Sequence, residues 1–281
     1  MRILITGAKG MLASDIQRVI SEKEEVIPLS KQELDITDSR KVMETICSLK
    51  PDIVIHCAAF TNVDQCELEP DKAYLVNTVG TWAVASACAR IGASLVYIST
   101  DYVFDGAKGA PYIEVDEPNP LNVYGKSKLG GEKVVLMNLQ RFFIVRTAGL
   151  YGANGKNFVT TILTRAREGK PLGVVADQVV SPTYTLDLAR AIAELIYSPY
   201  YGIYHITNQG EVSWHRFAQE ILRLSGLDVP VKPITSSEWP SPARRPLYSA
   251  LRSLSWEHFG FTPLRNWQEA LSDFLSQIGG V

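Results

Sequence analysis

The chain has 281 residues, which is enough for one large domain or two small ones. Hydrophobic residues make up 46% of the chain and charged residues 21%, an ordinary globular composition that excludes disordered and fibrous classes. The 28 lysines and arginines nearly balance the 30 aspartates and glutamates, giving a net charge of −2, so we expect neither nucleic acid nor an anionic membrane as a partner.

The cysteines and the first residues predict where the protein works. The four cysteines form no C-x-x-C pair and have no histidine at ligand spacing, so we expect reduced thiols, no zinc site and a reducing compartment. The apolar run before Gly7 is too short for a signal-peptide core, and no stretch approaches the roughly 18 apolar residues of a membrane span. These features predict a cytoplasmic protein without a membrane segment.

Short β-branched runs alternate with segments of helical period over the first hundred residues. The runs lie at residues 3–5, 26–27, 53–55 and 95–98. The segment after the first run places Leu12, Ile16 and Ile20 on one helical face, and a further helix is predicted at about 70–91. Apolar strands separated by helices indicate parallel strands covered on both faces. The pattern predicts an α/β fold with a doubly wound parallel sheet of the Rossmann type.

Beyond residue 120 the alternation loosens. Helices are expected near 123–138, 156–168, 185–197, 213–225 and 266–278, and a strand at 141–147. Five prolines between residues 229 and 247 exclude a regular element there and predict an ordered surface loop. We therefore expect a nucleotide-binding domain over residues 1–150. Residues 151–281 are expected to form mainly a smaller, irregular C-terminal substrate lobe, with some segments returning to the main sheet.

The sequence TGAKGMLA directly follows the first strand and opens the first helix. Gly7 permits the tight turn, Gly10 lets backbone N–H groups approach a pyrophosphate, and Ala13 allows close packing of helix on sheet. The helix N-terminus adds partial positive charge toward the phosphates. The spacing G-x-x-G-x-x-A is found in short-chain dehydrogenase/reductase folds, so it favours a dinucleotide cofactor over a turn without a ligand.

The end of the second strand indicates which dinucleotide is bound. It lacks the carboxylate that binds the ribose 2′-OH of NAD, whereas Ser30 and Lys31 suit a 2′-phosphate. NADPH is therefore the favoured cofactor, and a merely solvated Lys31 leaves NADH use open. Asp35 is placed to accept from the adenine amino group and Ile36 to cover the ring. The same segment is also expected to cap the next helix through Thr37 or Asp38.

Tyr124 and Lys128 are the candidate catalytic pair. On a helix, residues i and i+4 share one face, so both side chains can point into one cleft. A nearby ammonium favours phenolate and moves the pKa of a tyrosine toward neutrality. Thr100 ends the fourth strand, where doubly wound sheets bind ligands, so we expect it to hydrogen-bond a substrate oxygen beside Tyr124. His56, which ends the third strand, is expected to be a packed core histidine.

Motifs along the chain resemble the dTDP-4-dehydrorhamnose reductase family of extended short-chain dehydrogenases. They are TGAKGMLA, LDIT, HCAAFTNVD, YISTDYVFDG, NVYGKSKLGGE, NFV, VVADQVVSPT and ARRPLYSAL, which together run from residue 6 to 251. The resemblance implies hydride transfer from the nicotinamide to C4 of a 4-keto-6-deoxyhexose carried on dTDP, the step that yields dTDP-L-rhamnose. It also implies that Tyr124 donates the proton, Lys128 lowers the pKa of Tyr124 and holds the nicotinamide ribose, and Thr100 orients the carbonyl.

Two further sets of residues take their roles from this resemblance. Those expected to line the cofactor are Gly10, Met11, Leu12, Asp35, Ile36, Ala58, Ala59 and Phe60. Those expected to face the nucleotide sugar are Asp101, Tyr102, Asn157, Gln178 and Arg245. The Arg245 guanidinium suits a diphosphate because it offers a fixed fork of donors, and the alternative is a solvated arginine beside Arg244. The resemblance leaves a homodimer open. We place no set of magnesium-binding carboxylates of the kind through which some relatives dimerise, and we expect no metal.

The chain departs from the family at one position. Where the family often reads Arg-Thr-Ser-Trp, with the tryptophan against the sugar, this chain reads RTAG and ends in Gly149. Loss of the indole ring predicts a larger pocket, in which Tyr151 is expected to substitute partly for the missing tryptophan. A related dTDP-4-keto-6-deoxy sugar, for instance one reduced to a 6-deoxytalose, is therefore the alternative substrate.

Two other functions are less favoured by the residues. A nucleotide-sugar dehydratase or epimerase shares the fold, but dehydratases usually place an Asp-Glu pair after the strand-four threonine. Here Asp101 is followed by Tyr102, so the elimination acid is missing. A non-catalytic regulatory subunit does not require Tyr124, Lys128 and Thr100, all of which are present.

Overall fold

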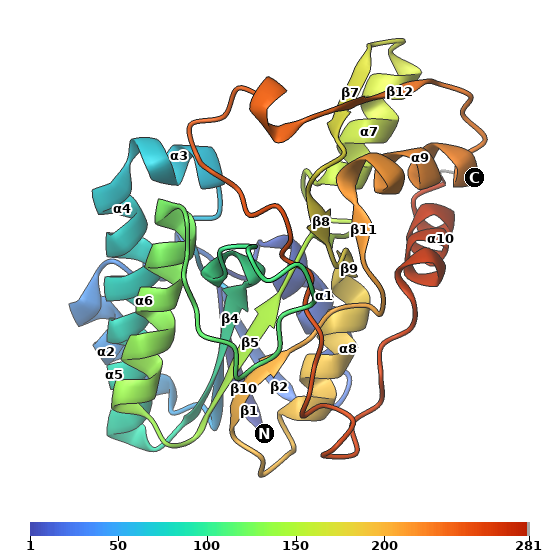
Figure 1. Ribbon diagram of the computed structural model, residues 1–281. Helices are drawn as coiled ribbons and strands as arrows, with labels where there is room; N and C mark the ends of the chain where they lie inside the picture. Colours follow the sequence, from blue (N-terminus) through green and yellow to red (C-terminus); the bar gives the residue numbers. More distant parts are fainter. Residues whose placement is uncertain (280–281) are drawn as a thin grey trace.

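The computed structural model describes residues 1–279 and contains one six-stranded parallel sheet in the order β10-β5-β4-β3-β1-β2 (Figure 1). Its strands are β1 (Arg2–Thr6), β2 (Glu25–Leu29), β3 (Ile53–His56), β4 (Ser94–Thr100), β5 (Phe142–Thr147) and β10 (Gly202–His205). All neighbouring pairs are parallel, which confirms the predicted doubly wound sheet. The strand order reverses between β1 and β3, the point at which such sheets bind ligands.

Helices cover both faces of this sheet because side chains alternate along each strand. One face carries α1 (Met11–Ile20) and α8 (Thr185–Leu195), and the other carries α2 (Ser39–Leu49), α5 (Thr81–Ile91) and α6 (Val123–Asn138) (Figure 1). In β1, Ile3 and Ile5 belong to the core under α1 and α8, whereas Leu4 belongs to the core under α2 and α5. The predicted apolar stripe of α1 is buried as expected.

The helix predicted at about 70–91 is present but is not a regular α-helix. It consists of α4 (Pro70–Tyr74), a π-helical stretch η1 (Leu75–Gly80) and α5. The wider π-helical turn directs the Asn77 side chain inward. Its amide oxygen accepts from the Phe60 N–H at 2.8 Å, and its amide nitrogen donates to the Phe60 carbonyl at 3.0 Å. It also donates to the Ser127 hydroxyl at 2.9 Å, so this turn links the segment after β3 to α6. A preceding helix, α3 (Val63–Leu68), was not predicted.

The second half of the chain forms a smaller lobe beside the sheet and also supplies β10. Its helices are α7 (Phe158–Arg167), α9 (Trp214–Leu224) and α10 (Trp267–Gln277), each within about two residues of its predicted range. Its short strands pair as β6 (Leu150–Tyr151) with β9 (Thr183–Tyr184), β7 (Leu172–Val175) with β12 (Val231–Ile234), and β8 (Val179–Val180) with β11 (Val212–Ser213). In its core the Tyr151 ring stacks on Tyr184, and the rings of Phe217 and Phe274 pack against this pair at a tilt.

The prediction that residues 229–247 contain no regular element was wrong in part. Strand β12 lies in this range and pairs in parallel with β7, with Pro233 opposite Val174. A two-stranded sheet has free edges, so a proline whose missing N–H faces outward is tolerated there. A short 3-10 turn (Ser236–Glu238) follows, and the chain then crosses to α3 before returning toward the sheet (Figure 1).

Arg245 and its neighbours hold this crossing segment in place. The Arg245 guanidinium lies 3.1 Å from the Asp64 carboxylate, and the Ser241 hydroxyl donates to the same carboxylate at 2.6 Å. The Asn122 amide donates to the Arg244 carbonyl at 2.8 Å. The C-terminal part of the chain is thereby fastened over the first half of the molecule.

The four cysteines are free thiols, and Cys66 and Cys88 among them are buried. Within residues 1–279, no helix combines the length and the apolar composition needed to cross a bilayer.

Candidate active site

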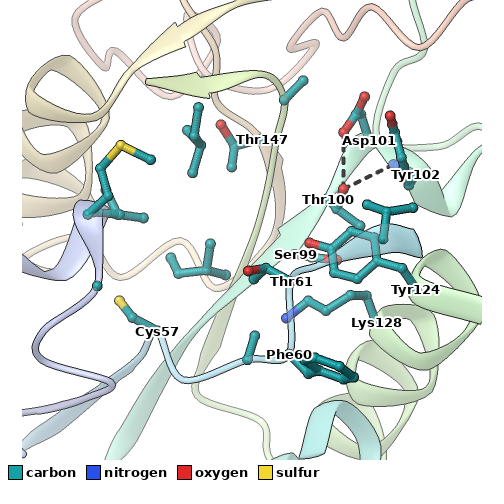
Figure 2. Close-up of a pocket in the computed structure, with 18 of the residues that line it drawn as sticks. Cys57, Phe60, Thr61, Ser99, Thr100, Asp101, Tyr102, Tyr124, Lys128 and Thr147 are labelled. Atoms are coloured by element: carbon teal, nitrogen blue, oxygen red, sulfur yellow. Dashed lines mark hydrogen bonds between the residues drawn. The ribbon is translucent and has the colours of Figure 1, made fainter. Parts of the chain in front are cut away.

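A cavity of about 600 Å³ opens at the carboxyl ends of the sheet strands. At one end it is lined by the turn between β1 and α1, and at the other by residues of β8, α9 and the segment after β12. Tyr124, Lys128 and Thr100 line it between these ends, and Figure 2 shows all three facing the same space. The structure therefore brings the predicted catalytic residues together.

The first end has the geometry of a phosphate-binding turn. Gly7 has a φ of +68°, and a Cβ on it would lie 2.7 Å from the Ala58 backbone, so only glycine fits this position. The Gly10 N–H donates to the Gly7 carbonyl at 2.8 Å, and Gly10 is the N-cap of α1. Because glycine offers no capping side chain, the first-turn N–H groups beside Met11 and Leu12 remain available to an anion.

Next to this turn lie the residues expected to hold the adenosine. Lys31, Asp35 and Ile36 line the cavity, together with Leu34. Ser30 does not line it, since its side chain is buried and its backbone N–H donates to the Glu33 carboxylate at 2.7 Å. One oxygen of Asp35 accepts from the Thr37 N–H at 3.0 Å and from the Thr37 hydroxyl at 2.8 Å.

The two hydrogen bonds from Thr37 lower the pKa of Asp35, which is therefore ionised at neutral pH. The Lys31 ammonium lies 3.9 Å from that carboxylate and is largely exposed. Asp38 is the N-cap of α2 and accepts from the Lys41 N–H at 3.0 Å, which confirms the predicted cap. Beyond the adenosine end, Ala58, Ala59 and Phe60 line the cavity as expected.

Lys128 is held in the interior of the molecule. Its ammonium lies 4.1 Å from the centre of the Tyr97 ring, and its backbone carbonyl accepts from the Tyr97 hydroxyl at 3.1 Å. Burial lowers the pKa of Lys128 to about 7, and the Glu132 carboxylate one helical turn later acts against this shift. The ammonium form therefore predominates only below about pH 7.

The state of Tyr124 differs from the prediction. Burial raises the pKa of Tyr124 above its ordinary value, the nearby Asp101 carboxylate adds to this, and the Thr100 hydroxyl acts in the opposite direction. The expected acidification by Lys128 is not found, and desolvation of the phenolate dominates the shift. Tyr124 is a protonated phenol at neutral pH, which is the state that a proton donor requires.

Thr100 and Asp101 form a polar wall next to Tyr124. The Thr100 hydroxyl donates to the Asp101 carboxylate at 3.0 Å and accepts from the Tyr102 N–H at 3.1 Å (Figure 2). The Ser249 hydroxyl donates to the other Asp101 oxygen at 2.6 Å. Burial raises the pKa of Asp101 to about 7, while the bonds from Ser249 and Thr100 act to lower it.

The remaining predicted sugar-site residues are not all on the cavity wall. Gln178 lines it, and its amide donates to the Ser236 hydroxyl at 2.9 Å. Asn157 is instead the N-cap of α7, and its amide donates to the Gly152 carbonyl at 2.8 Å. Arg245 also lies outside the lining residues, and its ion pair with Asp64 shows that it is not simply a solvated arginine.

His56 is a core residue, as predicted. Its Nδ1 lies 2.7 Å from the Thr6 hydroxyl and its Nε2 lies 3.1 Å from the Thr81 hydroxyl. Burial lowers the pKa of His56 to about 3, so the imidazole is neutral.

A buried ion pair behind the cavity was not predicted. Arg146 on β5 donates to both oxygens of Glu132 on α6, at 2.9 and 2.7 Å, and the Ser99 hydroxyl donates to Glu132 at 2.5 Å. The Arg146 and Glu132 side chains are 2% and 1% exposed. The pair fixes α6, and with it Lys128, against β4 and β5. An arginine in an otherwise apolar strand was the signal that could have revealed it.

The prediction about Tyr151 was wrong, whereas the larger pocket expected from Gly149 stays a prediction. Tyr151 is fully buried in the lobe core, where its ring lies 5.7 Å from that of Tyr184, so it cannot replace a ring in the cavity. A Cβ on Gly149 would lie 3.5 Å from the Trp214 ring, so the space beside residue 149 is already bounded by an aromatic side chain. Trp214 and Ser249 reach the cavity from distant parts of the chain. Trp214 belongs to none of the motifs, and Ser249 belongs to the ARRPLYSAL motif but was not expected at the site.

A tyrosine and a lysine one helical turn apart, facing the carboxyl end of β4 in a sheet of this winding, define a short-chain dehydrogenase/reductase. The chain matches the protein-family model of the RmlD substrate binding domain over residues 1–279. The chain is 44% identical to the spore coat polysaccharide biosynthesis protein SpsK of Bacillus subtilis, over 98% of this chain and 97% of that protein.

It is also 41% identical to the dTDP-4-dehydrorhamnose reductase of Streptomyces griseus, over 99% of this chain and 94% of that protein. The crystal structure of dTDP-4-dehydrorhamnose reductase from Bacillus anthracis in complex with NADP matches with a TM-score of 0.96 and 42% identity, over 98% of this chain and 99% of that one. The chain belongs to the dTDP-4-dehydrorhamnose reductase family and is an NAD(P)-dependent oxidoreductase.

Proposed function

We propose that this protein reduces the C4 ketone of dTDP-4-dehydro-L-rhamnose to dTDP-L-rhamnose, with NADPH as the hydride donor. The observation that carries the proposal is the single cavity that joins the glycine turn to a polar wall, with Tyr124 and Lys128 between them. Two ligands placed end to end in such a cavity meet at the Tyr124 hydroxyl. The names of the relatives and the NADP complex of a 42% identical protein support this choice of substrate and cofactor.

The residues at the first end fit a dinucleotide. The turn at Gly7 leaves no room for a side chain, and the first turn of α1 offers free N–H groups for the pyrophosphate. Lys31 would meet a ribose 2′-phosphate, Asp35 the adenine amino group, and Ile36 the ring face. When bound, NADPH supplies the hydride for the reduction.

The proton comes from Tyr124. Because its pKa is raised, the phenol keeps its proton until negative charge develops on the C4 oxygen, and it then donates that proton. The Lys128 ammonium, one turn along α6, stabilises the phenolate that results. Thr100 lies beside Tyr124, and its single hydroxyl proton goes to Asp101 in the free protein. When the ketone binds, the hydroxyl turns to donate this proton to the carbonyl oxygen and so orients it. Asp101, held by Ser249, fixes the position of Thr100.

The proposal is tested with a panel of dTDP-4-keto-6-deoxy sugars, each with NADPH or NADH, followed by cofactor absorbance and by NMR of the product. We expect stoichiometric oxidation of NADPH with dTDP-4-dehydro-L-rhamnose and formation of dTDP-L-rhamnose. Preferential turnover of another sugar, such as the precursor of a 6-deoxytalose, would replace the substrate but keep the chemistry. Conversion of a sugar without net NADPH consumption indicates an epimerase or a dehydratase, and no turnover of any sugar indicates a non-catalytic subunit.

A further inference from the structure

Trp214 is an unassigned aromatic residue on the wall of the cavity. It is the first residue of α9, and the preceding Ser213 caps that helix by accepting from the Arg216 N–H at 3.2 Å. The backbone N–H of Trp214 donates to the backbone carbonyl of Gln178 at 3.2 Å, which joins the start of α9 to a second cavity-lining residue. The helix cap at Ser213 and the hydrogen bond to Gln178 therefore fix the position of the Trp214 backbone.

Packing also fixes the orientation of the indole ring. The Phe158 ring lies 4.6 Å from it and the Phe217 ring 6.2 Å, centre to centre. The ring also lies near Gly149, where a Cβ would be 3.5 Å from the Trp214 ring. Trp214 is only half-buried and lines the cavity, so part of the indole is available to a ligand.

The wall around Trp214 is apolar, whereas the wall at the end of β4 is polar. Ala148 and Val180 line the cavity and belong to one hydrophobic cluster, against which Trp214 packs. Figure 2 shows Thr147, the residue before Ala148, across the cavity from Tyr124 and Lys128. A ligand between the two walls meets hydroxyl and carboxyl groups on one side and, apart from the Thr147 hydroxyl, mainly carbon atoms on the other.

A 6-deoxyhexose has matching surfaces. Its hydroxyl and ketone oxygens require hydrogen-bonding partners, while the C–H face of the ring and the C6 methyl group favour contact with an aromatic face. We propose that Trp214 is the platform on which the sugar ring of the substrate packs, and that Trp214, Val180 and Ala148 receive its C6 methyl group. This inference rests on the proposed function and assigns a specificity-determining role to a residue of α9.

The wall also predicts which sugars are disfavoured. The side chains of Ala148 and Val180 offer no hydrogen-bonding group, and the Trp214 indole offers only an N–H donor. A C6 hydroxyl placed against Trp214, Val180 and Ala148 would find no acceptor for its proton on these three side chains. Discrimination against a single added hydroxyl by an apolar pocket is about 100-fold at most. We therefore expect dTDP-L-rhamnose to bind more tightly than dTDP-L-mannose, which carries the C6 hydroxyl.

Binding experiments with the Trp214→Ala and Trp214→Phe variants test the platform. We expect Trp214→Ala to weaken dTDP-L-rhamnose binding about tenfold and to reduce its preference over dTDP-L-mannose, with dTDP and NADPH affinities unchanged. Trp214→Phe keeps an aromatic face and restores most of the affinity. In turnover, Trp214→Ala raises KM for the sugar more than it lowers kcat. Trp239→Ala is the matched control, since Trp239 is 49% exposed and does not line the cavity.

Fluorescence provides a readout that a purely structural role would not change. The chain has five tryptophans, and we expect dTDP-L-rhamnose to change the emission of the wild-type protein and of Trp239→Phe but not of Trp214→Phe. An unchanged response in Trp214→Phe overturns the inference even if Trp214→Ala fails to fold. Equal weakening of dTDP and dTDP-L-rhamnose binding also overturns it, because the indole would then contact the nucleotide.

The two proposals fail in different ways. Turnover by the wild-type protein with no effect of Trp214 on sugar affinity overturns the platform alone. Tryptophan-dependent sugar binding without any turnover overturns the reaction alone.

Discussion

Replacing Glu132 by glutamine tests whether the buried ion pair behind the cavity positions and tunes Lys128. The substitution preserves the shape of the side chain but leaves the Arg146 guanidinium, 2% exposed, without a countercharge. Removing one partner of a buried pair costs about 3–5 kcal/mol, because the remaining charge stays desolvated. For a chain of this size that loss corresponds to a decrease in Tm of roughly 6–20 °C.

The same substitution is expected to change the pH dependence of the reaction. Burial lowers the pKa of Lys128 to about 7, and the Glu132 charge opposes this shift. Without that charge the pKa of Lys128 falls further, so the ammonium form is lost at lower pH. The alkaline limb of the kcat/KM profile then moves toward acid in Glu132→Gln.

Urea unfolding and a pH–rate profile measure the two effects. The control is the double variant Glu132→Leu with Arg146→Met, which removes both charges and is expected to lose less stability than Glu132→Gln alone. Ser99→Ala, which removes one hydrogen bond to the charged Glu132 carboxylate, is expected to cost about 1.5–3 kcal/mol of stability. A Glu132→Gln protein as stable as wild type, with an unshifted profile, would refute the reasoning.

Three further predictions concern the cavity. Tyr124→Phe is expected to lower kcat about 100-fold to 10,000-fold in an NADPH oxidation assay with unchanged NADPH affinity, and retained turnover would exclude Tyr124 as the donor. Lys128→Met is expected to abolish turnover yet raise the free energy of unfolding by about 2–4 kcal/mol near pH 6. Because the pKa of Lys128 is depressed in the folded state, the folded state binds fewer protons than the unfolded state between about pH 7 and 10.5. The wild type therefore gains stability as the pH rises through this window, and the stability advantage of Lys128→Met shrinks. A stability advantage that stays constant with pH in urea melts would contradict this. Lys31→Asp is expected to lower the ratio of NADPH to NADH efficiency at least about tenfold, and an unchanged ratio would remove Lys31 from the 2′-phosphate site.

Much of the nucleotide-binding half could be predicted from local patterns. The sheet follows from the alternation of apolar runs and helical segments, and the glycine turn follows from spacing around Gly7 and Gly10, because both depend on residues close together in sequence. The pairing of Tyr124 with Lys128 on one helix face has the same origin. The structure brings this pair to the end of β4, beside Thr100.

The rest depends on contacts between distant segments. Ser249 and Trp214 reach the cavity from separate parts of the second half, and no local pattern marks where their side chains point. The raised pKa of Tyr124 depends on burial, which the spacing to Lys128 does not reveal. Asn77 belongs to a π-helical turn whose sequence has an ordinary helical period. The prediction of a loop around Pro233 failed because an edge strand tolerates proline, and the sequence does not show that this segment pairs at a sheet edge.

The pairing of β10 with β5 constrains any attempt to exchange sugar specificity between relatives. A fragment that stops after residue 150 would leave β5 as an open, apolar edge, a ready template for intermolecular association. Chimeras that graft a foreign lobe therefore need to retain residues 202–205 from the host or import a strand that matches its register. Evolution of new substrates on this scaffold is correspondingly easier by point changes in the lobe than by wholesale replacement.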